Sequence, residues 1–212
     1  MVNVLVVDDH LFAGTTISDS LTGRGFTCER VGTARDALAL VSQWIPDVAV
    51  LDFDLGLGPS GIDLAHALRK VQPNIGVILL TSYRDIRLAG KGIPRVPSGT
   101  RIFCKQDLES MEILHQGILS VRELPLAGPG VKLVAAGPTS VLTDAQVEVL
   151  LALGSGMTTA AIARSREVSD SAIEKMISRI GESLNISKGS DSNVRVQLIS
   201  TLNQLRTQSP PA

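Results

Sequence analysis

The stretch Val48-Ala49-Val50-Leu51-Asp52-Phe53-Asp54 decides the fold. Its first four residues are apolar, two of them β-branched, and turn-forming residues flank the stretch at Pro46-Asp47 and at Gly56, which is typical of a buried parallel strand. Asp52 directly follows the apolar run, at the carboxyl end of the predicted strand, where ligands collect in open α/β sheets. Aspartate is also a common turn residue, so the rest of the chain must decide between a functional and a structural role.

Length and composition fit a globular protein with a substantial core. The 212 residues suggest one or two domains of ~100–150 residues each. Hydrophobic residues make up 44% of the chain but aromatic residues only 3%, so we expect a core of aliphatic side chains. The net charge of −1 neither supports nor excludes binding to nucleic acid.

Cysteine usage and hydropathy predict the compartment. Cys28 and Cys104 are far apart without the spacing of metal ligands, so we expect reduced, buried thiols. No apolar run approaches the ~18 residues of a membrane span, and the first residues lack the basic region of a signal peptide. The sequence therefore predicts a soluble, cytoplasmic protein without a membrane partner.

Strand and helix patterns alternate through the amino-terminal part of the chain. Amphipathic helical spacing separates the apolar runs, although the Gly- and Pro-rich stretch 90–99 leaves room for only a truncated fourth helix after a short one at 84–89. This alternation predicts a five-stranded parallel sheet with helices on both faces. The predicted strands are 2–7, 26–31, 48–52, 77–80 and 102–104.

A second domain follows a change in composition. Residues 125–138 are rich in Gly, Ala and Pro and are predicted to form a linker between a first domain at 1–124 and a second at 139–207. The second domain shows helical periodicity without strand patterns, which indicates a small bundle of three or four helices. Residues 208–212 are expected to be a frayed tail.

Four predicted strands end in chemically active residues, namely Asp8-Asp9, Asp52, Thr81 and Lys105. In a parallel sheet these ends share one edge. Three carboxylates at one place repel each other unless a cation is present, and an oxygen-binding divalent ion such as Mg²⁺ is the economical answer. With Asp52 as nucleophile and with Lys105 and Thr81 holding the other oxygens, this edge is suited to a phosphoryl group.

Residues 1–123 resemble the receiver domain of two-component response regulators, and the resemblance implies a flavodoxin-like α/β fold. The resemblance implies that Asp9, Asp52 and the backbone carbonyl of Asp54 bind Mg²⁺, with Asp8 acting mainly through water. It also implies phosphorylation of Asp52 by a histidine kinase. The matching motifs are Val4–His10, Val50-Leu51-Asp52, Leu80-Thr81-Ser82 and Phe103-Cys104-Lys105.

The same resemblance implies a switch. Thr81 would move onto the phosphoryl group, and Phe103 would then turn inward. Two stretches differ from the common pattern of the family. The loop 55–61 is longer, and 90–99 replaces much of the fourth helix, whose face normally transmits the signal.

An alternative interpretation starts from the same residues. Asp52-Phe53-Asp54 after an apolar strand also resembles the nucleophile motif of haloacid-dehalogenase-type phosphatases. That family has an acidic pair late in the chain and Thr or Val after the motif. Here the acidic pair comes first and Leu55-Gly56 follows, so the phosphatase is a minor alternative.

Residues 142–186 resemble the helix-turn-helix of LuxR type found in the NarL/FixJ subfamily of response regulators. Ile162, Ala163, Val168 and Ile173 form the predicted packing wedge, and the helix that Ser169 opens has the right size for a major groove. At the start of this helix, backbone N–H groups also remain available to bind a phosphate. The predicted DNA contacts are Ser169, Ser171, Lys175, Arg179 and Lys188.

The charges of the second domain leave another possibility open. From residue 139 onward, seven basic residues are balanced by seven acidic ones. This balance is unfavourable for DNA binding, because neutralisation of phosphates dominates DNA affinity. The sequence predicts a phosphorylation-regulated transcription factor that is not a turnover enzyme and that binds promoter DNA as a homodimer. The alternative is a signalling adaptor whose helical domain binds a protein.

Overall fold

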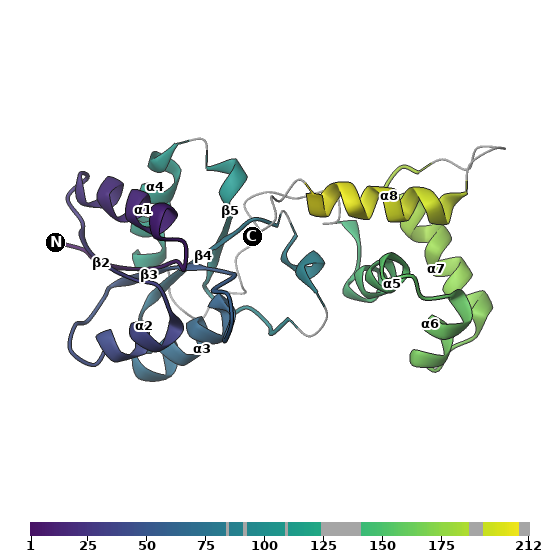
Figure 1. The fold of residues 1–212 in the computed structure, drawn as a ribbon, viewed down its shortest axis with the longest axis horizontal. Helices are drawn as coiled ribbons and strands as arrows, with labels where there is room; N and C mark the ends of the chain where they lie inside the picture. The colour runs from purple at the N-terminus through teal and green to yellow at the C-terminus, as the bar shows by residue number, and fades with distance from the viewer. Residues whose placement is uncertain (84, 91–92, 109, 124–140, 187–192, 208–212) are drawn as a thin grey trace. The chain divides into compact units, whose positions relative to one another are not determined.

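The computed structural model describes residues 1–83, 85–90, 93–108, 110–123, 141–186 and 193–207. The chain forms two compact units (Figure 1). The first comprises Met1–Ser82 and Pro94–Ala135, and the second comprises Tyr83–Ile93 and Ala136–Ala212. The predicted linker 125–138 and tail 208–212 lie outside the described residues.

The first unit contains the predicted five-stranded sheet. All four strand pairs are parallel and the strand order is β2-β1-β3-β4-β5, so the flavodoxin-like prediction is confirmed. The order reverses between β1 and β3, and such a switch point is where this class of sheet binds ligands. The strands are β1 (Asn3–Val7), β2 (Thr27–Val31), β3 (Val48–Asp52), β4 (Gly76–Thr81) and β5 (Arg101–Cys104).

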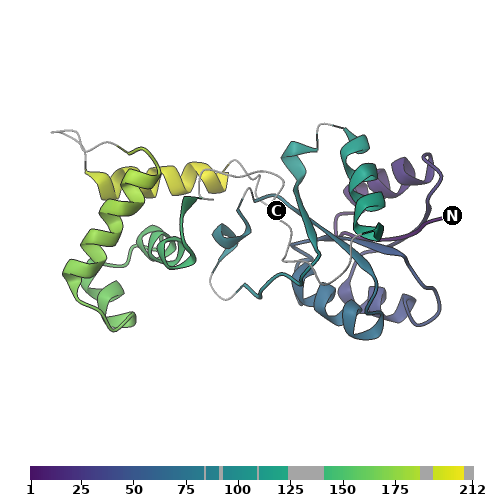
Figure 2. The ribbon, with the colours of Figure 1, turned by 180° about the vertical axis from the view of Figure 1, so that it is seen from behind.

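Helices cover both faces of the sheet (Figures 1 and 2). Helices α1 (Leu11–Thr22) and α4 (Met111–Glu123) lie on one face, and α2 (Ala34–Leu40) and α3 (Gly61–Val71) on the other. Every residue of β3 and β4 is buried. Burial on both faces explains why these strands are continuous apolar runs rather than alternating ones.

Side-chain caps set the starts of two of these helices. Thr33 accepts a hydrogen bond from the backbone N–H of Asp36 at the start of α2. Ser60 and Asp63 form a reciprocal capping box at the start of α3, which satisfies backbone groups that the first turn leaves open. The box fixes where α3 begins after the long loop that follows Asp52.

The connection from β4 to β5 leaves the first unit. It contains a short 3₁₀ helix, η1 (Ile86–Ala89), where the sequence predicted a short helix at 84–89. Tyr83–Ile93 belongs to the second unit, and the chain rejoins the first at Pro94. A second 3₁₀ helix, η2 (Lys105–Asp107), follows β5.

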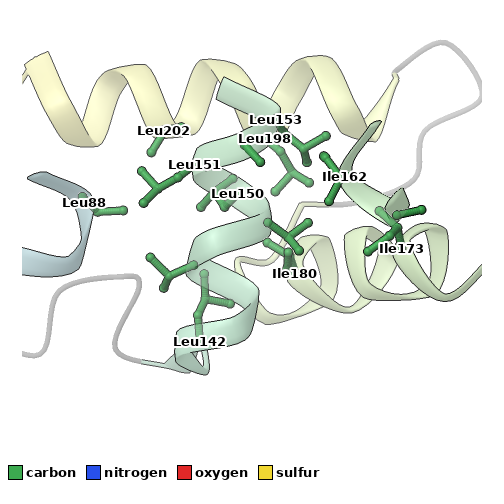
Figure 3. Packing of buried hydrophobic residues seen from close by; sticks show 14 residues of the cluster. Leu88, Leu142, Leu150, Leu151, Leu153, Ile162, Ile173, Ile180, Leu198 and Leu202 are labelled. Atoms are coloured by element: carbon green, nitrogen blue, oxygen red, sulfur yellow. The ribbon is translucent and has the colours of Figure 1, made fainter. Parts of the chain in front are cut away.

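The second unit is helical, as predicted. Helix α5 is its central element, and six of its residues are buried. Thr143, Thr158 and Ser169 cap α5, α6 and α7 with their side chains. Figure 3 shows the core around α5. The helices are α5 (Asp144–Gly154), α6 (Thr159–Ser165), α7 (Asp170–Ser183) and α8 (Val194–Thr207).

Two further observations bear on the sequence-based predictions. Both cysteines are free, and Cys104 is buried as expected, but Cys28 is only partly buried, so that part of the prediction is wrong. Cys28 lies on edge strand β2, whose residues include no fully buried one. None of the helices among the described residues combines the length and hydropathy that crossing a membrane requires.

Candidate functional site

The four predicted strand-end positions lie at one edge of the sheet. Asp52 ends β3 and pairs in register with Leu80, next to Thr81 at the end of β4. Thr81 pairs with Cys104, and Lys105 comes next. Because β1 is the other neighbour of β3, Asp8 follows at the same edge.

Lys105 bridges two buried carboxylates. Its Nζ lies 2.8 Å from Oδ2 of Asp52 and 3.2 Å from Oδ2 of Asp8. The side chains of Asp52 and Asp8 are only 6% and 2% exposed, whereas that of Lys105 is 28% exposed. Buried carboxylates need a paired cation, and the structure places the predicted ammonium against both.

The acidic groups converge as metal ligands would. Possible ligand atoms of Asp8, Asp9, His10 and Asp52 all lie within 4.8 Å of one another. His10 was not predicted as a site residue, although its position beside the acidic pair was a signal. Its Nδ1 lies 2.9 Å from Oδ1 of Asp9, and its backbone N–H donates to Oδ1 of Asp8 at 2.9 Å. His10 thereby holds both acids.

The electrostatics of the pocket show an excess of negative charge. Burial raises the pKa of the Asp52 carboxyl, and the hydrogen bond and charge of Lys105 offset this only in part. Burial lowers the pKa of the Lys105 ammonium, but its hydrogen bond to Asp52 and the charges of Asp52 and Asp8 outweigh this effect and raise it. The pKa values of both groups are therefore raised, that of Asp52 chiefly by burial and that of Lys105 by its carboxylate partners.

This donor set fits a hard divalent cation. The carboxylates offer the oxygen ligands that Mg²⁺ takes in proteins, and their excess negative charge is what such an ion would neutralise. Asp54 is exposed, and its carboxylate accepts from the backbone N–H of Gly56 at 3.2 Å. Its backbone N–H donates to Oδ1 of Asp52 at 3.4 Å. The metal-binding role of the Asp54 carbonyl stays a prediction.

Thr81 and Phe103 are not brought together. Thr81 is buried at the end of β4. Phe103 is buried in the cluster that also contains Leu80, and it packs against Gly117 of α4, where an added Cβ would come within 3 Å of the ring. Because neighbouring residues of a strand point to opposite faces, Thr81 faces away from the layer that holds Leu80 and Phe103.

A glycine supports the backbone of Asp52, and sequence reasoning missed it. The backbone N–H of Gly61, the first residue of α3, donates to the carbonyl of Phe53 at 2.9 Å. A Cβ at position 61 would lie 2.1 Å from the carbonyl oxygen of Asp52. The residue was recognised only as part of a Gly-rich loop, because such a close approach is visible only in three dimensions.

The predicted DNA contacts lie largely along one exposed face of α7. Ser171, Lys175 and Arg179 line an open depression with Ser178 and two acidic residues, Glu174 and Glu182. Ser169 caps the helix by accepting from the backbone N–H of Ala172. Lys188 lies outside the described residues.

The predicted packing wedge of the helix-turn-helix needs one correction. Ile162, Ala163 and Ile173 are buried in the core of the second unit, as predicted. Val168 is 45% exposed and was wrongly assigned to the wedge. It lies in the turn, where its backbone N–H closes the end of α6 by donating to the carbonyl of Ala163.

Comparison with known proteins finds similarity in the amino-terminal part of the chain. Residues 4–95 match the response regulator receiver domain. The probable transcriptional regulatory protein TcrX of Mycobacterium tuberculosis is 37% identical over 91 residues, which are 42% of this chain and 38% of TcrX. The chain spans less than two fifths of the length of the first curated relatives that it matches.

Other comparisons extend over both units. The probable transcriptional regulatory protein NarL of Mycobacterium tuberculosis is 28% identical over 199 residues, covering 88% of this chain and 89% of NarL. The structure of RcsB from Salmonella enterica bound to promoter rprA has a TM-score of 0.53 at 17% identity, covering 96% of this chain and 99% of RcsB, which shows likeness of fold. Residues 4–95 are therefore similar to the response regulator receiver domain, and the likeness in sequence to NarL and in fold to RcsB extends over both units.

Proposed function

We propose that the chain is a DNA-binding transcriptional response regulator that accepts a phosphoryl group on Asp52 from a sensor histidine kinase. The observation that carries this proposal is the convergence of Asp8, Asp9, Asp52 and Lys105 at the edge of a receiver sheet. The match of residues 4–95 to the response regulator receiver domain favours this proposal over the phosphatase alternative. The protein would act in the cytoplasm.

The chemistry is a single phosphoryl transfer. The bond between phosphorus and the histidine nitrogen of the kinase breaks, and a bond between phosphorus and a carboxylate oxygen of Asp52 forms. Lys105, already within hydrogen-bond distance of Asp52, would bind an oxygen of the transferred group, and the Thr81 hydroxyl would bind another. Positioning and charge neutralisation carry such a reaction.

A magnesium ion would be held by the carboxylates. We assign Asp9, Asp52 and the Asp54 carbonyl as direct ligands and Asp8 as a ligand through water. When bound, Mg²⁺ neutralises charge on the phosphoryl oxygens. His10 orients Asp8 and Asp9 through the contacts described above. Phe103 is left out of the proposed switch because it lies on the face of β5 away from Thr81.

Removing Lys105 tests its role. We expect Lys105→Ala to lower the free energy of unfolding by about 2 kcal/mol without Mg²⁺, because Asp52 and Asp8 lose their cation. Removing one partner of a fully buried ion pair would cost more. Millimolar Mg²⁺ should restore most of the lost stability. The variant should also respond more weakly to phosphorylation than the wild type does. Urea unfolding with and without Mg²⁺ measures the effect, with Lys105→Arg as the charge-retaining control. Equal stability of Lys105→Ala and wild type without Mg²⁺ would refute the pairing.

The helical unit would bind promoter DNA through α7, as a homodimer on two half-sites. Lys175 and Arg179 are exposed one turn apart on this helix, and Ile173 and Ile180 anchor its opposite side in the core. Such an arrangement presents a helix to a major groove. The description of RcsB as bound to promoter DNA supports this proposal.

The charge balance of α7 favours a second candidate, an adaptor that binds a protein. Glu174 and Glu182 share the exposed face with Lys175 and Arg179, and carboxylates repel phosphates. An adaptor would show no retention of random or promoter DNA even at low salt. Retention that weakens steeply with salt would instead support DNA binding.

Charge changes on α7 provide the sharper test. We expect Lys175→Ala and Arg179→Ala each to weaken DNA binding about tenfold, and each to reduce the salt dependence by about one phosphate contact. Glu174→Lys should tighten binding because it removes a repulsion. A salt titration by fluorescence anisotropy measures all three, with Arg122→Ala on α4 as a control of equal charge change. If Arg122→Ala weakened binding as much as Lys175→Ala, the assignment of α7 would be wrong.

A further inference from the structure

Arg30 of β2 holds the backbone of Asp8. Its Nη2 donates to the carbonyl of Asp8 at 3.1 Å. The parallel ladder between β1 and β2 ends with the pair Val7 and Val31, and the backbone N–H of Asp8 donates to the carbonyl of Val31 at 3.3 Å. The arginine therefore satisfies the Asp8 carbonyl just beyond the last pair of the ladder, where a buried backbone group still needs a partner.

A glycine makes room for this arginine. Helix α1 packs against β2 (Figure 1), and Gly14 of α1 is buried. A Cβ at position 14 would lie 2.4 Å from Nε and 3.2 Å from Cδ of Arg30. A larger residue would have to displace the arginine, because the end of that side chain is flexible whereas the helix is packed. The position of Arg30 therefore depends on Gly14.

The arrangement carries a cost that the bond to Asp8 must offset. Within the described part of the chain, Nε of Arg30 is buried and has no hydrogen-bond partner. Leaving a buried N–H group unpaired is unfavourable, and so is a glycine inside a helix. Two unfavourable features at contacting positions indicate a requirement that overrides local stability. The bond from Arg30 to the Asp8 carbonyl is the feature that both of them serve.

Asp8 passes this constraint on to the acidic site. Its Oδ1 accepts from the backbone N–H of His10 at 2.9 Å, and its Oδ2 accepts from Nζ of Lys105 at 3.2 Å. Nδ1 of His10 in turn lies 2.9 Å from Oδ1 of Asp9. A shift of the Asp8 backbone would therefore move the acidic pair and the lysine contact together. Groups that lie behind the direct ligands often set the affinity of a metal site in this way.

We propose that Arg30 is a positioning residue of the phosphorylation site: lying over Gly14, it fixes Asp8 and so holds the acidic pair in the arrangement that binds Mg²⁺. The inference rests on the proposed function, because Mg²⁺ and phosphorylation are part of that proposal. Arg30 acts through Asp8 and takes no part of its own in phosphoryl transfer. Its positive charge opposes the binding of a cation, so its contribution to affinity comes from geometry.

Magnesium binding by the full chain, measured by isothermal titration calorimetry, tests the role of Arg30. We expect Arg30→Ala to weaken Mg²⁺ binding about tenfold. A purely electrostatic role predicts the opposite sign, because removing a cation near the carboxylates would tighten binding. Arg24→Ala, exposed beyond the end of α1, removes an equal charge and should change the affinity by less than about twofold. Unchanged or tighter binding by Arg30→Ala would overturn the proposal.

Gly14→Ala separates displacement from charge, because it keeps the arginine. We expect about a tenfold loss of Mg²⁺ affinity in a folded protein, since alanine is the better helix former. The added Cβ would also lie 3.2 Å from Cβ of Asp8, so the double variant with Arg30→Ala completes the test. It should bind Mg²⁺ as weakly as Arg30→Ala alone, because no arginine is left to displace. A further loss of about tenfold in the double variant would overturn the coupling between Gly14 and Arg30.

Hydrogen exchange without Mg²⁺ gives a readout that does not depend on the metal. Amides of residues 8–14 should exchange about tenfold faster in Arg30→Ala than in the wild type, and unchanged exchange would contradict the hold of Arg30 on Asp8. If the wild type bound no Mg²⁺, the proposed metal site would fail, and the role of Arg30 in metal binding would fail with it. If the wild type bound Mg²⁺ and both single variants bound it equally well, only the positioning role would fail.

Discussion

Asp52→Asn is expected to abolish phosphorylation of the protein by acetyl phosphate and Mg²⁺. An amide oxygen is not a nucleophile under these conditions, so the transfer that releases acetate has no acceptor. The substitution is nearly isosteric, and the amide oxygen can still accept from Lys105 where Oδ2 accepts now at 2.8 Å. Labelling with radioactive acetyl phosphate, quantified after gel filtration, measures the loss. Labelling of Asp52→Asn at the wild-type level would refute the assignment of the acceptor.

Asp54→Asn is the matched control. Asp54 is exposed, and its side chain accepts a hydrogen bond from the backbone N–H of Gly56 that an amide oxygen can replace. Its proposed contribution to Mg²⁺ is the backbone carbonyl, which the substitution keeps. Labelling should therefore persist in Asp54→Asn. If both variants lost labelling equally, the acidic pocket would matter as a whole, and Asp52 would not be singled out.

The acidic site at the sheet edge was predictable because short-range patterns fix it. Continuous apolar runs predicted buried parallel strands, and a parallel sheet brings the carboxyl ends of its strands to one edge. The positions of Asp8, Asp52, Thr81 and Lys105 follow from the run that precedes each of them. The distances from Lys105 to Asp52 and Asp8 confirm that these ends converge.

The packing of Tyr83 and Leu88 was not predictable, because composition does not say where a loop packs. The Gly- and Pro-rich composition of 90–99 indicated the truncation of a helix, and η1 agrees with the short helix expected at 84–89. The docking of Leu88 depends on a hydrophobic surface formed by residues more than fifty positions later in the chain. Hydrophobic burial is not directional, so no local pattern identifies the partner.

Side-chain direction explains the smaller differences between the sequence-based predictions and the structure. Phe103 was expected to respond to Thr81, but its place in the strand directs it to the layer under α4, where Gly117 leaves room for the ring. Val168 has the apolar character of a wedge residue but occupies an exposed turn position. Strand register and turn geometry settle such cases, and both require the assembled fold.

Gly61→Ala is expected to produce the second large effect, on stability and phosphorylation together. The added Cβ would lie 2.1 Å from the carbonyl oxygen and 2.9 Å from the carbonyl carbon of Asp52, and it would also press on Leu79. Shifting the backbone at the end of a buried central strand costs much free energy, because the interior is close-packed. We expect a loss of about 3 kcal/mol in the free energy of unfolding, at the upper end of ordinary overpacking. The midpoint of urea unfolding measures it.

In Gly61→Ala, displacement of the Asp52 backbone should slow phosphorylation of Asp52 more than a general loss of stability would. Moving a reacting group by about 1 Å can cost roughly a hundredfold in rate, whereas a destabilised but folded protein keeps its site geometry. Gly23→Ala is the matched control, because Gly23 has an ordinary φ of −61° and an added Cβ would meet its nearest neighbours at 3.5 Å. It should change stability by less than about 1 kcal/mol. Normal labelling in fully folded Gly61→Ala would show that the approach of α3 does not position Asp52.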